Sequence, residues 1–379
     1  MPGTRRSGHN GRVPLKRTIL LLLLMLLPLA AAQVPVRVLL AEVPGLTVQF
    51  DGWHRGFVDG EARFETELPL SWPLRAEDGT IIIDGEPAGR TLRLETASGF
   101  VKYDGTTYRG ALAFTARGSD LLVLNAVDVE DYLRGVVPAE MQAVWPAEAL
   151  RAQAIAARSY VLSSLDYEAD YDVCATQDCQ VYDGTTREHP ATDAAVAATA
   201  GTVLTWEGAF ARTYYHADSG GAVASSEEVW GEDRPYLPAL TDVAADTPHR
   251  SWSVDIAAAR LAAELNASGL AVGTPHGLEV LERTRSGRAA RVRISGSSGS
   301  TVIEGTQLTA LLRALGLKST RFTVTGGLTV RGDGWGHGVG MSQYGALSMA
   351  RSGYTHSDIL AFYYPGTRLA RFNVSGRAD

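Results

Sequence analysis

The chain of 379 residues has only two cysteines, Cys174 and Cys179, which lie five positions apart in a polar segment. No histidine stands between positions 173 and 182 to complete a tetrahedral set of zinc ligands. Two neighbouring cysteines in an exported chain are typical of a disulfide. We therefore expect a disulfide between them and no cofactor, with half of a zinc site as the alternative.

Positive charge is scarce beyond the N-terminus. The net charge is −7, and the first 32 residues carry five cations and no acid, so the rest of the chain has a net charge of −12. Nucleic-acid binding requires a basic face that neutralises phosphates. This charge balance excludes nucleic acid as the main partner.

Long apolar runs are also missing. The run at residues 19–27 is shorter than the ~20 residues that span a bilayer, and no other segment approaches that length. It follows a basic start and precedes Pro28 and three alanines at positions 30–32. This order predicts a secretory signal peptide over residues 1–32, with an uncleaved anchor as the alternative. We expect an exported protein with no membrane span after signal removal.

The usual nucleotide and nucleophile motifs are absent. The abundant glycines, 40 in all, form neither a GxGxxG loop after a first strand nor a Walker loop. Asp218 and Ser219, followed by two glycines, resemble the nucleophile loop of trypsin-like proteases. No upstream histidine stands in the context that this family requires. The sequence therefore argues against a serine protease, and a glycine turn beside a strand is the alternative.

Five glycines alternate with other residues over positions 332–340. If the segment is extended, one face lacks side chains, and Trp335 and His337 stand on the other. A flat substrate could lie on such a surface, and a tryptophan could stack on a sugar ring. A tight crossing in the core is the alternative.

The first part of the chain, residues 33–118, has the pattern of a β region. Asp-Gly pairs recur there, and several stand between short runs rich in β-forming residues, which is typical of hairpins. These pairs occupy positions 51–52, 59–60, 78–79, 84–85 and 104–105. The segment has no nucleophile motif and no histidine cluster. We expect this segment to be an accessory β region that contacts the cell wall or a partner protein.

Helical patterns appear after residue 121. Pro146 suits a first helical turn, and Leu150, Ala154, Val161 and Leu165 recur at helical spacing. Alanines on the same segment allow close packing, so we expect a buried central helix at about 146–165. Further helices are expected near 194–200, 255–265, 307–315, 342 and 355, and strands at 121–125, 203–206, 210–216, 278–282, 290–294 and 322–324. These elements predict an α+β fold.

Glu140 is the strongest candidate for chemistry. It stands among Val136, Val137, Pro138 and Met141, just before the central helix. Apolar surroundings disfavour a charged carboxylate, so its pKa should rise. A raised pKa suits a general acid at neutral pH. A glutamate that only begins a helix or forms an ion pair is the alternative.

Several blocks of the sequence resemble the SpoIID/LytB family, in the order in which they occur there. The longest are residues 123–141, which end in Pro-Ala-Glu-Met, and residues 145–160. Shorter blocks occur at residues 179–182, 216–221, 226–231, 235–237, 335–346 and 363–367. The resemblance thus covers residues 119–369, which we take as an α+β core domain, and leaves 370–379 as a tail.

The resemblance implies an exported cell-wall or periplasmic protein that acts on peptidoglycan glycan strands. The sporulation branch consists of lytic transglycosylases, whose catalytic glutamate corresponds to Glu140. The other branch contains enhancers of a cell-wall amidase. We therefore expect either a transglycosylase or a non-catalytic amidase activator. The matched blocks contain the residues expected to bind the glycan: His216, Asp218, Ser219, Glu227, Trp335, His337 and Gln343.

A transglycosylase can use one carboxyl group first as acid and then as base, because the sugar's own 6-hydroxyl replaces water. The second carboxylate of ordinary glycosidases can then be absent. A further acidic group could still ease the positive charge that develops at C1. Four candidates are Asp218, Glu227, Glu228 and Asp333. The family also includes a member with a zinc site of Cys and His near the cysteine loop, and this chain lacks that histidine.

Overall fold

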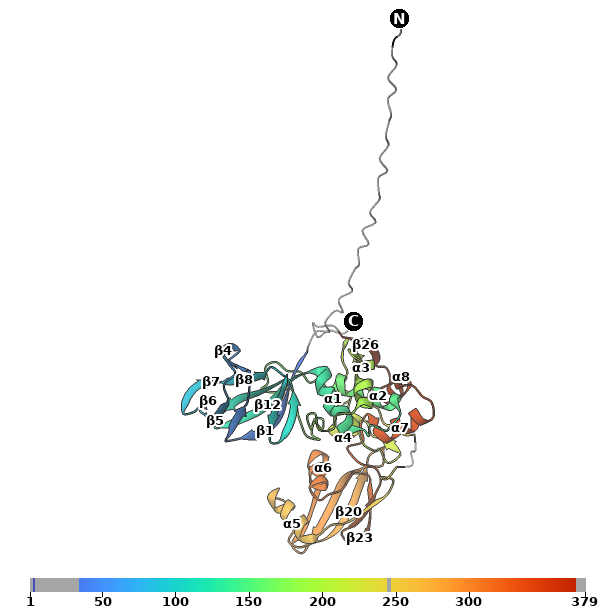
Figure 1. Cartoon of the computed structure of the whole chain (residues 1–379). Helices are drawn as coiled ribbons and strands as arrows, with labels where there is room; N and C mark the ends of the chain where they lie inside the picture. The colour runs from blue at the N-terminus through green and yellow to red at the C-terminus, as the bar shows by residue number, and fades with distance from the viewer. Residues whose placement is uncertain (1–2, 4–33, 244–246, 373–379) are drawn as a thin grey trace. The chain divides into compact units, whose positions relative to one another are not determined.

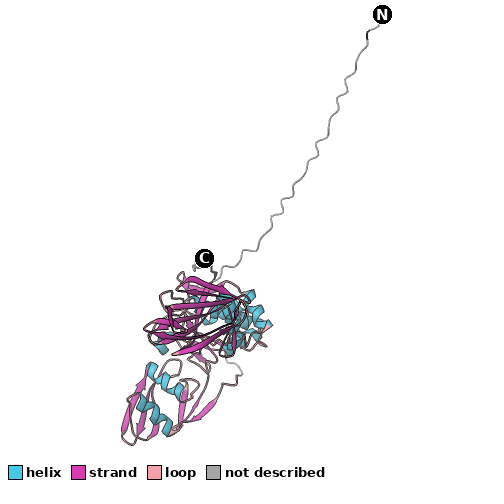
Figure 2. Cartoon of the chain, turned by 60° about the vertical axis from the view of Figure 1, so that its left-hand side comes forward, coloured by secondary structure: helices cyan, strands magenta, loops and turns pink. Residues whose placement is uncertain are grey.

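The computed structural model describes residues 3, 34–243 and 247–372, and the predicted signal peptide lies almost wholly outside this range. The structure contains both helices and strands, and the strands form several small sheets, so the predicted α+β class is confirmed (Figures 1 and 2). Within the described residues, no helix has both the length and the apolar character needed to cross a membrane.

Two sheets form the N-terminal part. One has seven strands in the order β13-β1-β12-β11-β8-β3-β4, and the other has four in the order β2-β5-β6-β7. Their facing side chains share one apolar core. The strands are β1 (Pro35–Val43), β2 (Gly45–Phe50), β3 (His54–Val58), β4 (Glu61–Thr66), β5 (Leu70–Glu77), β6 (Thr80–Ile83), β7 (Glu86–Gly89), β8 (Thr91–Thr96), β11 (Ala111–Arg117), β12 (Asp120–Asp128) and β13 (Val173–Cys174); β9 (Phe100–Tyr103) and β10 (Thr106–Arg109) form a separate hairpin.

Four of the five Asp-Gly pairs form the predicted hairpin turns. At Asp59, Asp78, Asp84 and Asp104 both the aspartate and the following glycine have positive φ, the backbone that a tight two-residue turn requires. The pair at 51–52 forms no such hairpin, because β2 pairs with β5 and β3 pairs with β4 and β8.

The N-terminal sheet continues directly into the following core. β1 pairs along its length with β12, from Pro35 opposite Asp128 to Val43 opposite Leu121. Asp128 then caps helix α1 (Val129–Glu140) by accepting a hydrogen bond from the Glu130 N–H. The sheet and the first helix are therefore joined without a linker, which fixes the start of α1.

The predicted central helix is α2 (Ala147–Leu162), which begins after Pro146 and is buried on nearly every side. Small alanine side chains let α1, α3 (Pro190–Ala198), α7 (Gln343–Arg351) and α8 (His356–Tyr363) pack around it. The helix ends before Leu165, because the chain turns at Ser163. Thr355 and Asp358 form the predicted capping box of α8.

Short strands complete this core, together with helix α4 (Ser226–Trp230). They are β14 (Thr202–Trp206), β15 (Ala209–Phe210), β16 (Tyr215–His216), β17 (Ala222–Val223), β18 (Leu240–Thr241), β25 (Met341–Ser342) and β26 (Arg368–Arg371). The hairpin expected over residues 203–216 is confirmed only for β14 and β15. His216 leaves it, because β16 pairs with β25 instead.

Residues 252–332, called the insert module below, have an apolar core of their own. Helices α5 (Ala258–Ala267) and α6 (Gly305–Ala314) lie against its strands (Figure 1). These strands are β19 (Trp252–Asp255), β20 (Pro275–Arg283), β21 (Ala289–Gly296), β22 (Gly299–Glu304), β23 (Phe322–Gly326) and β24 (Thr329–Gly332). The sequence predicted most of these elements but did not separate them from the core.

Candidate functional site

Glu140 is the last residue of α1, and its side chain is held by two hydrogen bonds. The Val181 N–H donates to Oε1 at 3.0 Å, and the Gln343 Nε2 donates to Oε2 at 3.0 Å. Burial raises the pKa of Glu140, and these two donors counteract the rise because they favour the ionised form. The net shift is upward, in the direction that the apolar flanks predicted.

A buried glutamine, Gln180, fixes the loop segment that reaches Glu140. Gln180 accepts a hydrogen bond from the Tyr132 hydroxyl at 3.0 Å and donates one to the Tyr215 hydroxyl at 2.9 Å. Its neighbour Val181 is thereby held with its N–H toward the Glu140 carboxylate. Burial, and then the charge of Glu140, raise the pKa of Tyr215, so this phenol stays protonated.

The parallel pair β16 and β25 brings distant residues beside Glu140. Tyr215 lies opposite Met341, and His216 lies opposite Ser342. Ser342 then caps α7 by accepting a hydrogen bond from the Gly345 N–H, which makes Gln343 the first residue of that helix. A single strand pairing therefore places both His216 and Gln343 at the site.

Glu140 lines a pocket of about 290 Å³. His216, Trp335, His337 and Gln343 line the same pocket, so the structure gathers four of the seven residues expected to bind glycan. Two tryptophans at the pocket are partly open to solvent: Trp230 is 36% exposed and Trp335 is 46% exposed. The pocket therefore combines aromatic faces with a partly buried acid.

The two pocket histidines are neutral. Burial, followed by the electrostatic effect of a nearby His337 and Arg288, holds the pKa of His216 well below its ordinary value. Burial and the Arg288 charge lower the pKa of His337 to about 4. His216 Nδ1 lies 3.1 Å from the Val339 carbonyl and must donate to it, so Nε2 is an acceptor. That Nε2 is buried and has no hydrogen-bond partner among the described residues.

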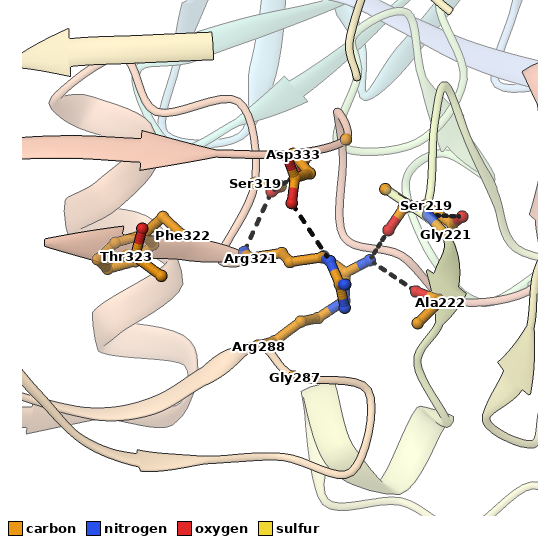
Figure 3. Close-up of polar contacts among 12 residues, drawn as sticks. Ser219, Gly221, Ala222, Gly287, Arg288, Ser319, Arg321, Phe322, Thr323 and Asp333 are labelled. Carbon is orange, nitrogen blue, oxygen red and sulfur yellow. Dashed lines mark hydrogen bonds and ion pairs between the residues drawn. The ribbon is translucent and has the colours of Figure 1, made fainter. Parts of the chain in front are cut away.

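Arg288 of the insert module reaches the backbone of Ser219 and Ala222 in the core (Figure 3). Its side chain is fully buried, and Nη2 donates to the carbonyls of Ser219 at 3.0 Å and Ala222 at 3.3 Å. Burial lowers the pKa of Arg288 to about 10, which leaves the group cationic at neutral pH. The module therefore supplies a fixed positive charge behind the pocket.

Asp218 and Ser219 lie outside the pocket lining. Asp218 accepts hydrogen bonds from the Gly220 N–H and the Thr247 hydroxyl, and Ser219 donates to Asp242 at 2.5 Å. Both side chains are buried by these contacts. They shape the loop after His216, and the structure does not bring them to Glu140.

Glu227 stands exposed in the first turn of α4, a position that favours an acid because of the helix dipole. Glu228 and Asp333 were also considered as acids that could stabilise positive charge at C1 of the sugar. Neither of them lines the pocket. Among the lining residues, the only carboxylates are Glu140 and Asp178. Asp178 is 60% exposed and is paired with Arg313 at 2.5 Å.

The glycine stretch does not present a bare face to a substrate. Gly334, Gly336, Gly338 and Gly340 have positive φ, so the segment is a series of turns and not an extended strand. A Cβ at Gly334 would meet the backbone of residues 218–220, and one at Gly340 would overlap the Tyr214 carbonyl. The glycines are needed for close packing, while the side chains of Trp335 and His337 between them line the pocket.

Cys174 and Cys179 form a disulfide that closes a short loop at the pocket, and Cys179 is itself a lining residue. The bond uses both thiols. Within residues 34–243 and 247–372, no three His, Cys, Asp or Glu side chains gather as metal ligands. The predicted disulfide therefore occupies both cysteines that the alternative, half of a zinc site, would need as ligands.

Further pocket residues were not selected from the sequence. They are Tyr160, Gln177, Val181, Tyr214, Tyr215 and Trp230. Val181 and Trp230 belong to the blocks that resemble the family, which was the available signal for them. Tyr160 also belongs to such a block, as its last residue, whereas Tyr215 carries no local pattern that separates it from a core tyrosine.

Comparison with known proteins identifies the core. Residues 117–206, which include Glu140, match the family described as Stage II sporulation protein, SpoIID. The Stage II sporulation protein D of Bacillus subtilis is 32% identical over 270 residues, covering 64% of this chain and 75% of that protein. Its namesake in Bacillus amyloliquefaciens is 30% identical over 269 residues, covering 64% and 74%. The chain belongs to the Stage II sporulation protein D family. The predicted family resemblance is confirmed.

Two further proteins are similar to about three quarters of this SpoIID-family chain. The amidase enhancer of Bacillus subtilis is 32% identical over 341 residues, and the match covers 75% of this chain but only 47% of that protein. An uncharacterized protein of Brachyspira hyodysenteriae is 32% identical over 285 residues, covering 74% and 76%. Residues 244–340, which include the insert module, match a separate domain of unknown function (DUF8618).

Proposed function

We propose that this SpoIID-family protein acts outside the cytoplasm on the bacterial cell wall, as a lytic transglycosylase that cuts peptidoglycan glycan strands. The observation that carries the proposal is Glu140, a partly buried carboxyl whose pKa burial raises, in a pocket that two exposed tryptophans also line. A cell-wall role also agrees with the similarity to an amidase enhancer.

In the first step, protonated Glu140 donates its proton to the glycosidic oxygen that leaves C1 of N-acetylmuramic acid. The bond between C1 and that oxygen breaks, and positive charge develops at C1. In the second step, the Glu140 carboxylate takes the proton of the 6-hydroxyl of the same sugar. The 6-oxygen bonds to C1, which closes a 1,6-anhydro ring and restores the protonated glutamate.

The carboxylates of the pocket support this route over hydrolysis. A hydrolase of the common type needs a second carboxylate, about 5–9.5 Å from the acid, as nucleophile or base. Asp178 is paired with Arg313 and exposed, so Glu140 is the one unpaired carboxylate of the lining. Transfer to the sugar's own hydroxyl requires only that one group.

The neutral histidines have the polarity to bind sugar hydroxyls. His216 offers its unpartnered Nε2 as an acceptor. His337 Nδ1 accepts from the Val339 N–H at 3.0 Å, so its proton resides on Nε2. Trp335 and Trp230 offer faces for the ring carbons. These groups would orient the strand with its glycosidic oxygen toward Glu140.

A second candidate function is a non-catalytic activator of a cell-wall amidase, which the similarity to the amidase enhancer favours. This activator would use the same pocket to hold glycan without cutting it. The two functions differ in product, since only the transglycosylase forms 1,6-anhydro-muramic ends.

The deciding experiment incubates the purified chain with peptidoglycan and reads the soluble products by mass spectrometry. We expect anhydro-muramic products from the wild type and a loss of about 10²–10⁴-fold in Glu140→Gln, which keeps shape but removes the transferable proton. Glu227→Gln, at an exposed position outside the pocket, is the matched control and should retain activity. Full activity in Glu140→Gln would refute the mechanism, and no product from the wild type would favour the activator.

A further inference from the structure

A separate pocket of about 260 Å³, called the arginine pocket below, is lined by Arg283, Arg321 and Arg331. Its wall comes from the insert module and from the residues that directly flank this module in the sequence. It shares no lining residue with the pocket that contains Glu140. The residues that match the SpoIID family, 117–206, contribute nothing to it, so the family match does not account for this pocket.

The insert module is basic, in contrast to the chain as a whole. Residues 252–332 contain ten Lys and Arg against five Asp and Glu, a net charge of +5, whereas the whole chain has a net charge of −7. A local excess of positive charge draws anions from solution even when the protein is acidic overall. The arginine pocket is a concave part of this basic module, so it is the place where an anion would be held.

Backbone carbonyls hold two of the three guanidinium groups in place. Arg283 donates from Nη1 to the Gly287 carbonyl at 2.9 Å and from Nη2 to the Phe322 carbonyl at 2.8 Å. Arg321 donates from Nη1 to the Ser286 carbonyl at 2.6 Å. A neutral acceptor orients a guanidinium group without cancelling its charge, and each group keeps further N–H donors. The two arginines are therefore positioned in advance for an anion.

Arg331 completes the set from the middle strand of its sheet. Strand β24 lies between β19 and β23, and both Ser253 and Thr323 lie opposite Arg331. The exposed side chain of Arg331 forms no hydrogen bond and no ion pair within the described residues. Among the lining residues the only carboxylate is Asp333, whose Oδ2 lies 3.8 Å from Nε of Arg321 (Figure 3). Three cations thus share one pocket with a single acid.

We propose that the arginine pocket binds a phosphate ester group of an anionic polymer of the cell envelope. Arginine forks pair well with phosphate and with carboxylate oxygens. The oxygens of a phosphate point in different directions, so they can accept from guanidinium groups that come from separate strands and loops. A carboxylate is planar and would leave one of the three groups without a partner. This inference goes beyond the proposed function and does not depend on Glu140.

The pocket favours a polymer over a free phosphate ion. An ion that replaces two or three waters, at about 30 Å³ each, would leave most of the 260 Å³ empty. The carbon chain of an ester can fill the remaining space. Exposed Arg285, in the same turn as Gly287, forms no ion pair within the described part of the chain and can meet the next charge of a repeating polymer.

The test titrates the purified full chain with fluorescently labelled poly(glycerol phosphate) at about 0.15 M salt, where loose surface attraction is screened. Labelled polyglutamate with the same number of charges replaces phosphates by carboxylates. Unlabelled glycerol 3-phosphate, inorganic phosphate and phosphatidylglycerol vesicles are added as competitors. None of these probes contains a glycan, so the outcome is independent of the proposed function.

We expect poly(glycerol phosphate) to bind at least about tenfold more tightly than polyglutamate, and glycerol 3-phosphate to displace it. Arg331→Gln should weaken binding of the polymer about tenfold with no change in melting temperature, because this side chain holds no other part of the fold. Arg331→Lys keeps the charge but loses the fork, so it should also weaken binding. Arg260→Gln is the matched control: it removes an exposed arginine of α5, outside the pocket, that also contacts a backbone carbonyl, and it should have no effect.

Equal affinity for polyglutamate, or an equal loss in Arg260→Gln, would show attraction by charge alone and overturn the inference. Inorganic phosphate that binds as tightly as the polymer would indicate a site for the free ion instead. Vesicles that bind more tightly than the polymer would indicate a lipid surface. Unchanged polymer binding in Arg331→Gln would remove the arginine pocket from any role in binding.

Discussion

Gly338 leaves the space that the guanidinium group of Arg288 occupies, since a Cβ at position 338 would overlap its Nη2, Cζ and Nε atoms. The glycine belongs to the segment that carries His337, and the arginine belongs to the insert module. This contact therefore couples the module to the pocket through close packing of a buried cation.

Gly338→Ala should destabilise the protein by about 3 kcal/mol, because it adds a buried clash to the strain of a left-handed backbone. Gly118→Ala is the matched control, since Gly118 also has positive φ but no atom within 4 Å of the added Cβ. The control should cost only about 1 kcal/mol. Denaturant unfolding of both variants measures the difference, and equal losses would show that the contact with Arg288 yields easily.

Arg288→Met should raise the pKa of His216 and of His337, because a nearby positive charge disfavours the imidazolium form. Burial is the larger cause for both rings, so their pKa values should remain below the ordinary histidine value. Titration of the imidazole C–H signals by NMR measures the change. Arg285→Met, in the same turn but exposed, should leave both rings unchanged, and unaltered titration in Arg288→Met would contradict the assigned cause.

Gln343→Leu should shift the pH dependence of cleavage. The Gln343 amide donates to the Glu140 carboxylate and so favours the ionised form. Removing this donor raises the pKa of Glu140 further. Since the first step needs the protonated acid, the limb on which kcat/KM falls with rising pH should move to higher pH. Exposed Gln142→Leu is the control, and a limb that stays in place or moves to lower pH would refute the role of the hydrogen bond.

Reduction of the Cys174–Cys179 disulfide should lower the free energy of unfolding by about 2 kcal/mol, the loop-entropy estimate for so short a loop. Glycan affinity should fall as well, because Gln177, Asp178 and Cys179 form one wall of the pocket. Intact mass of the oxidised chain should be two hydrogens below the reduced value. Cys174→Ser/Cys179→Ser should reproduce both losses, whereas free thiols that bind zinc stoichiometrically would contradict the disulfide.

Local patterns predicted much of the fold. In the Asp-Gly turns both residues have positive φ, which aspartate tolerates because its side chain is short and glycine adopts freely because it has no Cβ. The start of α2 after Pro146 and the capping box of Thr355 and Asp358 also depend on near neighbours. Helix α1 was not predicted as a helix. It contains Pro138, which disfavours a helix interior, and Asp128 is the cap that marks its start.

The candidate site was only partly predictable, because distant pairings create it. Tyr215 pairs with Met341 although the whole insert module stands between them in the sequence, and no local pattern predicts that register. Ser219 was expected at the site because it stands in one of the blocks that resemble the family, residues 216–221. Its hydrogen bond to Asp242, which places it away from the pocket, joins segments that give no sequence signal of contact.

The position of the insert module has an evolutionary consequence. The core strands β16 and β25 lie on either side of the segment that contains it and pair with each other directly. At the base of the module, Trp252 likewise lies opposite Gly332. The core can thus hold Glu140, His216 and Gln343 together whatever is inserted between these strands. Evolution can therefore replace the inserted segment without disturbing the strand pairing that places His216 and Gln343 beside Glu140, since no residue of the insert module lines their pocket.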